Sequence, residues 1–361
     1  MIIKILKGEY NMRAAVFHNE HDIRVENIDV ADVSENQVKI KVAWAGICGS
    51  DLHEYNAGPI FIPKDEESPL TGSQAPLTMG HEFSGVIEEI GSNVQGLKVG
   101  DKVTVNPLIT GKVHEKALVD MYKGFTFIGL GSDGGFADYA VVDQENIIKL
   151  QDDTSLELGA LVEPTAVALQ AIRESEMRLG DSVTVFGAGP IGLLTVIAAR
   201  AAGAKDIIVF DLSDTRLEKA KEVGATHIVN SSNEDPVEFI KKLYPDGVDR
   251  SFEVAGVSVT LNQAISVTRA RGMVTIVSIF EKPMEFNPML LTSSGVRISS
   301  TLAYEPDIFE ATVKMMESGQ IDSFPIITDH IELEDIVEKG FEALTNDKSQ
   351  AKILVKLSGD K

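Results

Sequence analysis

The sequence predicts an α/β protein in which a doubly wound parallel sheet is combined with a second, β-rich part. Two patterns carry this prediction. After residue 156, near-continuous apolar strands alternate with helical segments, as in a parallel sheet covered on both faces. Between residues 12 and 150, short runs alternate with period two between glycines, which indicates strands with one buried face. A chain of 361 residues is long enough for two or three domains.

The β-rich part comes first along the chain. Its alternating runs predict strands at residues 38–46, 83–91, 102–107 and 136–142. Four prolines lie between residues 58 and 77, and proline is compatible with neither a helix interior nor a central strand, so this stretch is expected to be a surface loop. Residues 106–135 contain six glycines and receive no assignment.

The parallel sheet follows. Six apolar runs predict its strands, at residues 183–186, 206–210, 226–230, 250–255, 273–279 and 296–300. The segments between them have helical patterns, so each pair of strands is joined by a crossover. The tail then predicts a helix after Pro306, a helix over residues 333–344 and a closing strand at residues 352–357.

Composition and charge narrow the class of partner. Hydrophobic residues make up 43% of the chain and charged residues 24%, which is typical of a globular protein rather than a disordered one. The 33 lysines and arginines stand against 55 acidic residues, a net charge of −22, and this argues against binding to nucleic acid or to anionic membranes. We therefore expect a small-molecule partner.

The cysteine count and the apolar runs indicate the compartment. The single cysteine, Cys48, excludes an intrachain disulfide and any four-cysteine zinc site, and it favours the reducing cytoplasm. The longest apolar runs, such as residues 193–199 and 273–277, are far shorter than the roughly 18 residues of a membrane span. Residues 1–11 lack the pattern of a secretory signal, so we expect a protein that neither crosses a membrane nor is exported.

A glycine-rich turn follows the first strand of the parallel sheet. The segment GAGPIG contains Gly187, Gly189, Pro190, Ile191 and Gly192, and an alanine-rich helix continues from it. The first glycine permits a tight turn, the second lets the backbone approach a pyrophosphate, and the third lets the helix pack closely on the strand. The phosphates would then lie at the positive end of that helix. The spacing favours a dinucleotide site over a glycine turn that merely packs.

An acidic residue indicates which dinucleotide the turn binds. Asp211 ends the next strand, 19 residues after Gly192 (211 − 192), where a carboxylate can hold the two hydroxyls of an adenosine ribose. The same carboxylate would repel a 2′-phosphate, and the nearest arginine, Arg216, follows on the next helix. NAD is therefore predicted in preference to NADP.

A set of metal-binding residue types lies in the β-rich part. Cys48 occurs in GICGSDLH, and His81 and Glu82 occur in GHEFSG, 33 residues after the cysteine (81 − 48). A thiolate, an imidazole and a carboxylate are the donors that zinc accepts at a catalytic site with one open position. Glu163, in LVEPTA, is a further candidate ligand. Each residue taken singly is more often structural, so it is their combination that predicts a metal site.

These motifs make the family recognisable. The chain resembles the zinc-containing medium-chain alcohol dehydrogenases, in the branch of the sorbitol and (R,R)-butanediol dehydrogenases. The resemblance runs from Met12 onward and rests on MRAAVFH, CGSDLHEY, the FIP and PLTG insertion, MGHEFSGVIEEIGS, VGDKVTVNP, DGGFADYAVV, LELGALVEPTAVA, GAGPIG and FEVAG. It implies a GroES-like β-rich catalytic domain at residues 1–160 and 302–361, and a Rossmann NAD-binding domain at residues 161–301.

The resemblance also implies roles for individual residues. Cys48, His81 and either Glu82 or Glu163 match the catalytic zinc ligands, and the choice between the two glutamates stays open. Three positions on the CGSDLH segment match other roles: Ser50 the hydroxyl that contacts the substrate oxygen, His53 the relay of protons to solvent, and Asp51 the partner that orients His81.

One departure from the family concerns a second metal. Relatives commonly bind a structural zinc with four cysteines in the segment between VNP and DGGF, and this segment has no cysteine here. We therefore predict one catalytic zinc per chain and no structural zinc. Relatives form dimers or tetramers, so a homo-oligomer is expected, although the missing cysteines put subunit contacts in that segment in doubt.

The predicted reaction is a zinc- and NAD-dependent interconversion of a vicinal diol and a hydroxyketone, and the resemblance suggests 2,3-butanediol and acetoin. A second glutamate near the metal adds negative charge and a hydrogen-bond acceptor that suit a second hydroxyl. Sorbitol-like polyols and a threonine-type zinc dehydrogenase are the alternative enzymes. A non-enzymatic NAD-binding redox sensor is the alternative of another class, and zinc content distinguishes it, because such a sensor would have lost the metal.

Overall fold

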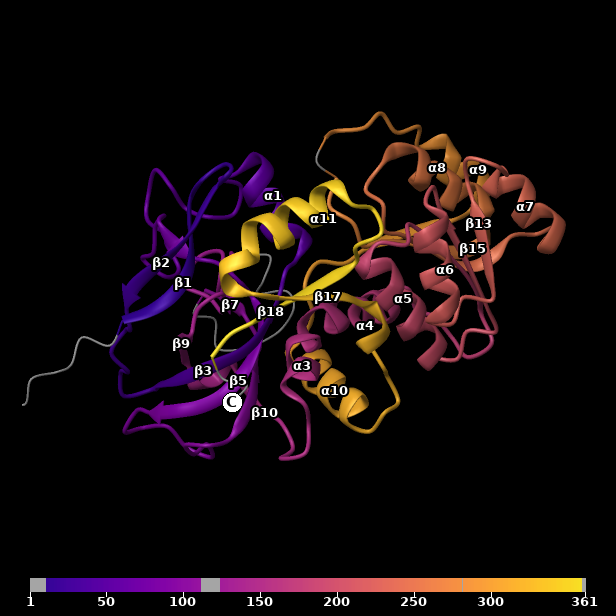
Figure 1. The fold of residues 1–361 in the computed structure, drawn as a ribbon. Helices are drawn as coiled ribbons and strands as arrows, with labels where there is room; N and C mark the ends of the chain where they lie inside the picture. Colours follow the sequence, from indigo (N-terminus) through magenta and orange to yellow (C-terminus); the bar gives the residue numbers. More distant parts are fainter. Residues whose placement is uncertain (1–10, 112–123, 281, 359–361) are drawn as a thin grey trace, which may run out of the picture. The chain divides into compact units, whose positions relative to one another are not determined.

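The computed structural model describes residues 11–111, 124–280 and 282–358, and it divides the chain into two compact units (Figure 1). The first unit takes Met1–Glu163, Asp329–Asn346 and Ile353–Lys361, and the second takes Pro164–Thr328 and Asp347–Lys352. The chain therefore leaves the first unit at residue 164 and returns at residue 329, and it passes briefly through the second unit again at residues 347–352.

The first unit is built mainly of antiparallel strands. One sheet has the order β2-β1-β4, a larger sheet has the order β10-β6-β5-β3-β18-β17 with β9 also paired to β3, and β7 pairs with β8. The strands are β1 (Asn11–Asn19), β2 (Asp22–Asp29), β3 (Gln37–Gly46), β4 (Leu77–Thr78), β5 (Glu82–Ile90), β6 (Lys102–Val105), β7 (Leu108–Thr110), β8 (Phe125–Phe127), β9 (Tyr139–Asp143), β10 (Ile147–Lys149), β17 (Ile327–Glu332) and β18 (Lys352–Lys356). The short helical segments are α1 (Gly49–Ala57), η1 (Gln144–Asn146), α3 (Leu156–Ala160), η3 (Leu333–Asp335), η4 (Ile336–Glu342) and α11 (Ala343–Asn346).

The second unit contains a six-stranded sheet in the order β13-β12-β11-β14-β15-β16, and every pair in it is parallel. Its strands are β11 (Ser182–Phe186), β12 (Asp206–Asp211), β13 (His227–Asn230), β14 (Val248–Glu253), β15 (Thr268–Ile276) and β16 (Arg297–Ser300). The helices are α4 (Val162–Glu174), which begins at the unit boundary, α5 (Pro190–Ala201), α6 (Asp214–Glu222), α7 (Pro236–Leu243), α8 (Ser258–Val267), α9 (Met289–Ser294), α10 (Pro306–Glu317) and η2 (Phe324–Ile326). This strand order is that of a Rossmann fold.

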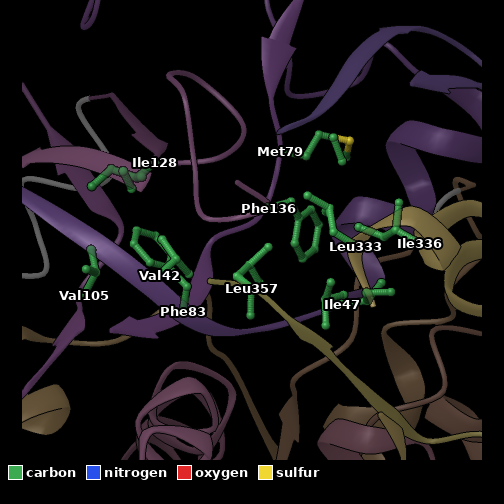
Figure 2. Close-up of a cluster of buried hydrophobic side chains, with 14 of the residues drawn as sticks. Val42, Ile47, Met79, Phe83, Val105, Ile128, Phe136, Leu333, Ile336 and Leu357 are labelled. Carbon is green, nitrogen blue, oxygen red and sulfur yellow. The ribbon is translucent and has the colours of Figure 1, made fainter. Parts of the chain in front are cut away.

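Each unit has its own hydrophobic core. In the first, Val42 and Phe83 from β3 and β5, together with Phe136 just before β9, pack with Leu333 and Leu357 from the end of the chain, as Figure 2 shows. The core of the second unit gathers buried apolar side chains from the central strands and from α8. Burial of the late residues in the first core explains why the chain returns there, since apolar area removed from water stabilises that arrangement.

The predicted α/β fold class is confirmed, and each of the predicted runs contributes to a strand. The segment predicted as a helix over residues 333–344 is helical but irregular, with a 3-10 turn followed by a π-type helix at Ile336–Glu342. The predicted runs did not include β1, β2, β4, β7, β8, β10 or β17, and residues 112–123 of the unassigned glycine-rich segment lie outside the described residues.

The unit boundaries differ from the predicted ones mainly at the return. The first falls at residue 163 rather than 160, but residues 302–328, expected in the catalytic domain, lie in the second unit. The reason is contact with α4: Arg173 forms ion pairs with Glu305 and Asp307, and the hydroxyls of Thr165 and Ser323 are 2.9 Å apart. Helix α10 therefore completes the second unit before the chain returns.

A buried carboxylate anchors the proline-rich loop. The side chain of Glu54, in α1, is fully buried, and it accepts hydrogen bonds from the backbone N–H groups of Ile60, Phe61 and Ile62. Burial raises the pKa of the Glu54 carboxyl, and the three N–H donors oppose that rise. Ile60 and Phe61 remain exposed while Ile62 is buried in the core, so these bonds hold the start of the loop together with the packing of Ile62.

Replacing this carboxylate should release the loop. We expect Glu54→Ala to lower the free energy of unfolding by about 2–3 kcal/mol, because buried N–H groups lose a charged acceptor. Limited proteolysis should cut the variant faster between residues 58 and 77. Glu66→Ala, which removes an exposed acid of the same loop, is the control. Equal cleavage rates and stabilities for the two variants would contradict the anchoring role.

Candidate functional site

Cys48 lies at the junction between β3 and α1. It is the N-cap residue of that helix, and its backbone N–H donates to Asp51 Oδ2 at 2.9 Å. A carboxylate in the first turn of a helix also interacts favourably with the helix dipole. The sequence GICGSD thus ends the strand and starts the helix at the cysteine, which holds its side chain in a defined place.

Strand pairing brings the second motif to the cysteine. In the antiparallel pair of β3 and β5, Gly46 lies directly opposite Glu82. Before β5, the chain turns at Gly80, whose φ is +98°, and a Cβ there would lie 2.8 Å from Phe136 N. As a result, residues that are 33 positions apart in the sequence meet. The ligating atoms of Cys48, His81 and Glu82 all lie within 4.8 Å of one another.

The donor set fits a zinc ion. Sulfur, imidazole nitrogen and carboxylate oxygen are all zinc donors, and three protein ligands leave a position open. His81 and Glu82 are buried while Cys48 is partly exposed. The Glu82 side chain lies directly over Gly46, where any Cβ would collide with Glu82 Oε2.

Asp51 and Ser50 flank the two nitrogens of His81. Asp51 Oδ1 lies 3.4 Å from His81 Nδ1, and neither atom has a hydrogen-bond partner among the described residues. Ser50 Oγ lies 3.3 Å from His81 Nε2. Burial alone would lower the pKa of His81, but the negative charges of Asp51 and the Cys48 sulfur raise it well above its usual value. The carboxylate beside Nδ1 leaves Nε2 as the atom that faces the other donors.

The remaining predicted site residues of this unit are less closely grouped. His53 is half-buried on α1, three positions after Ser50 and so on the same face of the helix. Glu163 is buried in the first turn of α4 and does not belong to the three-residue donor group. The sequence analysis missed Phe127, whose ring centroid lies 6.3 Å from that of His81. Only the β7–β8 pairing brings it there, and no local pattern signals that contact.

The glycine turn in the second unit has the form expected of a dinucleotide site. Gly187 has a φ of +108°, and a Cβ on Gly189 would meet no atom within 4 Å, which leaves that backbone open to approach. A Cβ on Gly192 would collide with the Gly187 carbonyl oxygen. Pro190 is the first residue of α5, and the Ile191 carbonyl accepts a hydrogen bond from Thr195 within that helix. The three glycines therefore meet the three requirements of the motif.

The two charged residues expected near the coenzyme differ in their contacts. Asp211 Oδ2 accepts from Ala188 N at 2.7 Å, so the carboxylate lies directly at the glycine turn. Its other oxygen accepts from Ser213 N at 2.9 Å. Arg216 Nε instead donates to the Lys348 carbonyl at 2.9 Å, within the second unit. The arginine is thus engaged with the chain's own backbone.

A β-rich unit with a sulfur, nitrogen and oxygen donor group and a second unit with a Rossmann sheet define the class of zinc-binding dehydrogenases. Two family models match the chain: an alcohol dehydrogenase GroES-like domain over residues 34–152 and a zinc-binding dehydrogenase over residues 190–318. The chain belongs to the zinc-binding alcohol dehydrogenase family, as the resemblance in its sequence predicts. No helix in the described part of the chain is long and apolar enough to span a membrane.

Known relatives are similar over nearly the whole chain. The (R,R)-butanediol dehydrogenase of Bacillus subtilis is 47% identical over 96% of this chain and 99% of its own. The sorbitol dehydrogenase of the same organism is 34% identical over 96% and 97%. The crystal structure of the Bacillus subtilis 2R,3R-butanediol dehydrogenase matches with a TM-score of 0.92, at 47% identity over 96% of this chain and all of that one.

Two further solved structures carry nicotinamide coenzymes. A zinc-binding dehydrogenase of Sinorhizobium meliloti bound to NADP is 28% identical, with a TM-score of 0.86 over 96% of this chain and 99% of its own. An alcohol dehydrogenase of Escherichia coli complexed with NADH is 25% identical, with the same TM-score over the same shares of both chains. The fold is therefore shared by dehydrogenases that take either coenzyme.

The close approach of Gly46 to Glu82 can be tested directly. We expect Gly46→Ala to weaken zinc binding about 10–100-fold, the usual effect of disturbing a residue that supports a metal ligand, because the new Cβ displaces the Glu82 carboxylate. Competition with a chromophoric chelator measures the affinity. Gly49→Ala, whose Cβ meets nothing within 4 Å, is the control. Unchanged zinc affinity in Gly46→Ala would contradict the arrangement.

Proposed function

We propose that this protein is a zinc- and NAD-dependent dehydrogenase that interconverts a vicinal diol and a hydroxyketone, and that 2,3-butanediol and acetoin are its substrates. The observation that carries the proposal is the group formed by Cys48, His81 and Glu82, whose ligating atoms lie within 4.8 Å of one another. It occurs in a chain that is 47% identical to a butanediol dehydrogenase over 96% of its length.

Different residues of the first unit would bind the metal and orient its ligands. Cys48, His81 and Glu82 would hold the ion, and Asp51 would keep the His81 ring oriented through Nδ1, 3.4 Å away. When bound, zinc lowers the pKa of an alcohol and the nicotinamide ring accepts the hydride. Loss of a hydride also requires loss of a proton, so the site needs a route for that proton.

Ser50 and His53 supply a proton route. Ser50 Oγ lies 3.3 Å from His81 Nε2, on the side that faces the donors, where its hydroxyl can accept a proton from the substrate and pass one on. His53 follows on the same face of α1 and is half-buried, so it has contact with solvent. An imidazole suits a relay because one ring nitrogen can accept a proton while the other donates one.

The proposed substrate class draws on the two candidate glutamates. If Glu82 binds directly, Glu163 remains as a buried carboxylate at the start of α4 that can accept a hydrogen bond from a second hydroxyl. Sorbitol-like polyols are the second candidate, because a sorbitol dehydrogenase is 34% identical over 96% of this chain. Both candidates are vicinal diols, so they share this requirement.

The contacts of the glycine turn favour NAD. Asp211 lies at that turn through its bond to Ala188 N, where its negative charge would repel a 2′-phosphate. Arg216, the nearest arginine, holds its Nε against the Lys348 carbonyl, and no bond joins it to the glycine turn or to Asp211 among the described residues. The single cysteine of the chain also limits it to one catalytic zinc of this ligand type and favours the reducing cytoplasm.

A stereoisomer assay tests the reaction. We expect NADH formation with NAD and only some stereoisomers of 2,3-butanediol, with turnover at least about 100-fold slower with NADP, because one repelled phosphate costs several kcal/mol. The zinc content should be one ion per chain, and removal of zinc by a chelator should abolish turnover. The outcomes that contradict the proposal are faster oxidation of ethanol or benzyl alcohol than of butanediol, or full activity without zinc. Absence of zinc from carefully prepared protein would instead support the redox-sensor alternative.

The two glutamates can be separated by matched variants. We expect Glu82→Gln to lower zinc affinity by at least about 10–100-fold, the loss seen for residues that only support a ligand, because an amide replaces a charged oxygen donor. Glu163→Gln should keep zinc but reduce turnover of diols more than that of simple secondary alcohols. Zinc titration and parallel assays with both substrates measure this. Zinc loss in Glu163→Gln with retention in Glu82→Gln would reverse the two roles.

The second unit also favours a homo-oligomer. Strand β16 is the last of the six-stranded sheet, and in the described residues it pairs only with β15. Met289 and Leu302, on either side of β16 in the sequence, are 60% and 37% exposed. An open strand edge with apolar neighbours suits pairing with a second copy of the chain. Light scattering should give a multiple of the 39.1 kDa chain mass, and a mass of 39.1 kDa would contradict this.

A further inference from the structure

The carboxylate of Glu253 lies at the end of β14, fully buried, and accepts four hydrogen bonds. Oε1 accepts from Ala255 N at 3.0 Å, from Gly256 N at 2.9 Å and from Thr260 Oγ1 at 2.7 Å. Oε2 accepts from Ser278 Oγ. Among the described residues no basic side chain forms an ion pair with this carboxylate, so hydrogen bonds alone compensate for its burial.

These bonds tie together two loops at one end of the sheet. Ala255 and Gly256 lead from β14 into α8, and Ser278 follows β15. The Glu253 backbone carbonyl also accepts from Val277 N at 2.9 Å. A Cβ on Gly256 would lie only 2.7 Å from the Ile279 carbonyl oxygen, so the two loops are in close contact. Glu253 thus fixes both loops relative to β14.

The same loops abut the dinucleotide turn. Val254 N donates to the Phe186 carbonyl at 2.9 Å, and a Cβ on Gly187 would lie 3.2 Å from Ala255 N. Strand β11 lies between β12 and β14, so the strand order reverses at the β11–β14 pair. In open parallel sheets, ligands bind outside the carboxyl ends of the strands at such a reversal. The Glu253 loops therefore form one wall of the expected coenzyme site.

The two sides of this reversal suit different halves of a dinucleotide. Asp211, at the end of β12, lies on the side that receives the adenosine ribose. The other half of the molecule extends across β11 to the ends of β14 and β15. The residues there, from Val254 to Gly256 and around Ser278, take their positions from Glu253.

We propose that Glu253 is a positioning residue for the nicotinamide half of the coenzyme. It acts through the loops it holds and leaves the adenosine half unaffected. The inference rests on the proposed nicotinamide coenzyme and deepens it. A purely structural role, in which Glu253 only stabilises the second unit, predicts instead that both halves of the site weaken together.

The comparison of NADH with AMP distinguishes the two roles, because AMP occupies only the adenosine half. Glu253→Met retains the size of the side chain and removes its acceptors. We expect its affinity for NADH to fall about tenfold or more, the scale of losing one hydrogen bond to a charged group, with AMP affinity within twofold of the parent. Glu253→Gln, which keeps one oxygen acceptor, should lose less. Calorimetry on the zinc-loaded protein measures both ligands.

Asp249 provides a matched control on the same strand. It lies near the opposite end of β14, and it too accepts several hydrogen bonds, from Ser182 N at 2.9 Å, Ser182 Oγ at 2.8 Å and Arg269 Nε at 2.7 Å. Asp249→Asn should lower the melting temperature without changing the ratio of the NADH and AMP affinities. Should Glu253→Met fail to fold, Glu253→Gln and Ser278→Ala make the same comparison, with smaller losses for NADH alone.

Each result bears on the inference. Unchanged NADH affinity in the Glu253 variants, or equal losses for NADH and AMP, would overturn it and leave the proposed function standing. An altered affinity ratio in Asp249→Asn would overturn it as well, since the effect would not be specific to the Glu253 end of the strand. If the parent protein bound no NADH, both the coenzyme proposal and this inference would be wrong.

Discussion

The pairing of β3 with β5 is the constraint on which the candidate metal centre depends. It sets Gly46 opposite Glu82 and so brings Cys48, just after β3, to His81, just before β5. Backbone hydrogen bonds between the two strands form whatever the metal-ligating side chains on those strands are. They can therefore hold a thiolate, an imidazole and a carboxylate in a small space that their mutual charge would otherwise oppose. At position 46, only glycine leaves room for the Glu82 side chain.

Carboxylates organise the loops of both units. Asp51 caps the helix that begins after the cysteine, Glu54 holds the proline-rich loop, Asp211 receives the N–H of the glycine turn, and Glu253 ties two loops at the end of the parallel sheet. In each case an acidic oxygen accepts from backbone N–H groups that a loop would leave unsatisfied. The acidic composition of the chain is thus not only a property of its surface.

Local patterns in the sequence were sufficient for the parallel sheet, for strands β3 and β5, and for the glycine turn. Apolar runs joined by helical crossovers predict the parallel sheet because each strand of such a sheet is buried on both faces. GAGPIG predicts the turn because only glycine accepts the backbone conformation and the close contacts found at that turn. Strand β17 escaped prediction, since it forms by pairing with β18. The helix predicted over residues 333–344 is present, but its irregular form at Ile336–Glu342 has no local signal. Residues 302–328 lie in the second unit, unlike the prediction, and their contacts with α4, such as the buried Thr165–Ser323 hydroxyl pair, have no local signature in the sequence.

The sequence by itself determined the family, the coenzyme motif and the types of metal donor, because residue identity and short-range spacing specify donor chemistry and turn geometry. The tertiary structure decided which donors meet. It grouped Glu82 with Cys48 and His81, engaged Arg216 with a backbone carbonyl, and buried Glu253 among four donors. Those outcomes depend on strand register and on long-range packing. Neither is encoded within a few residues of the side chain concerned.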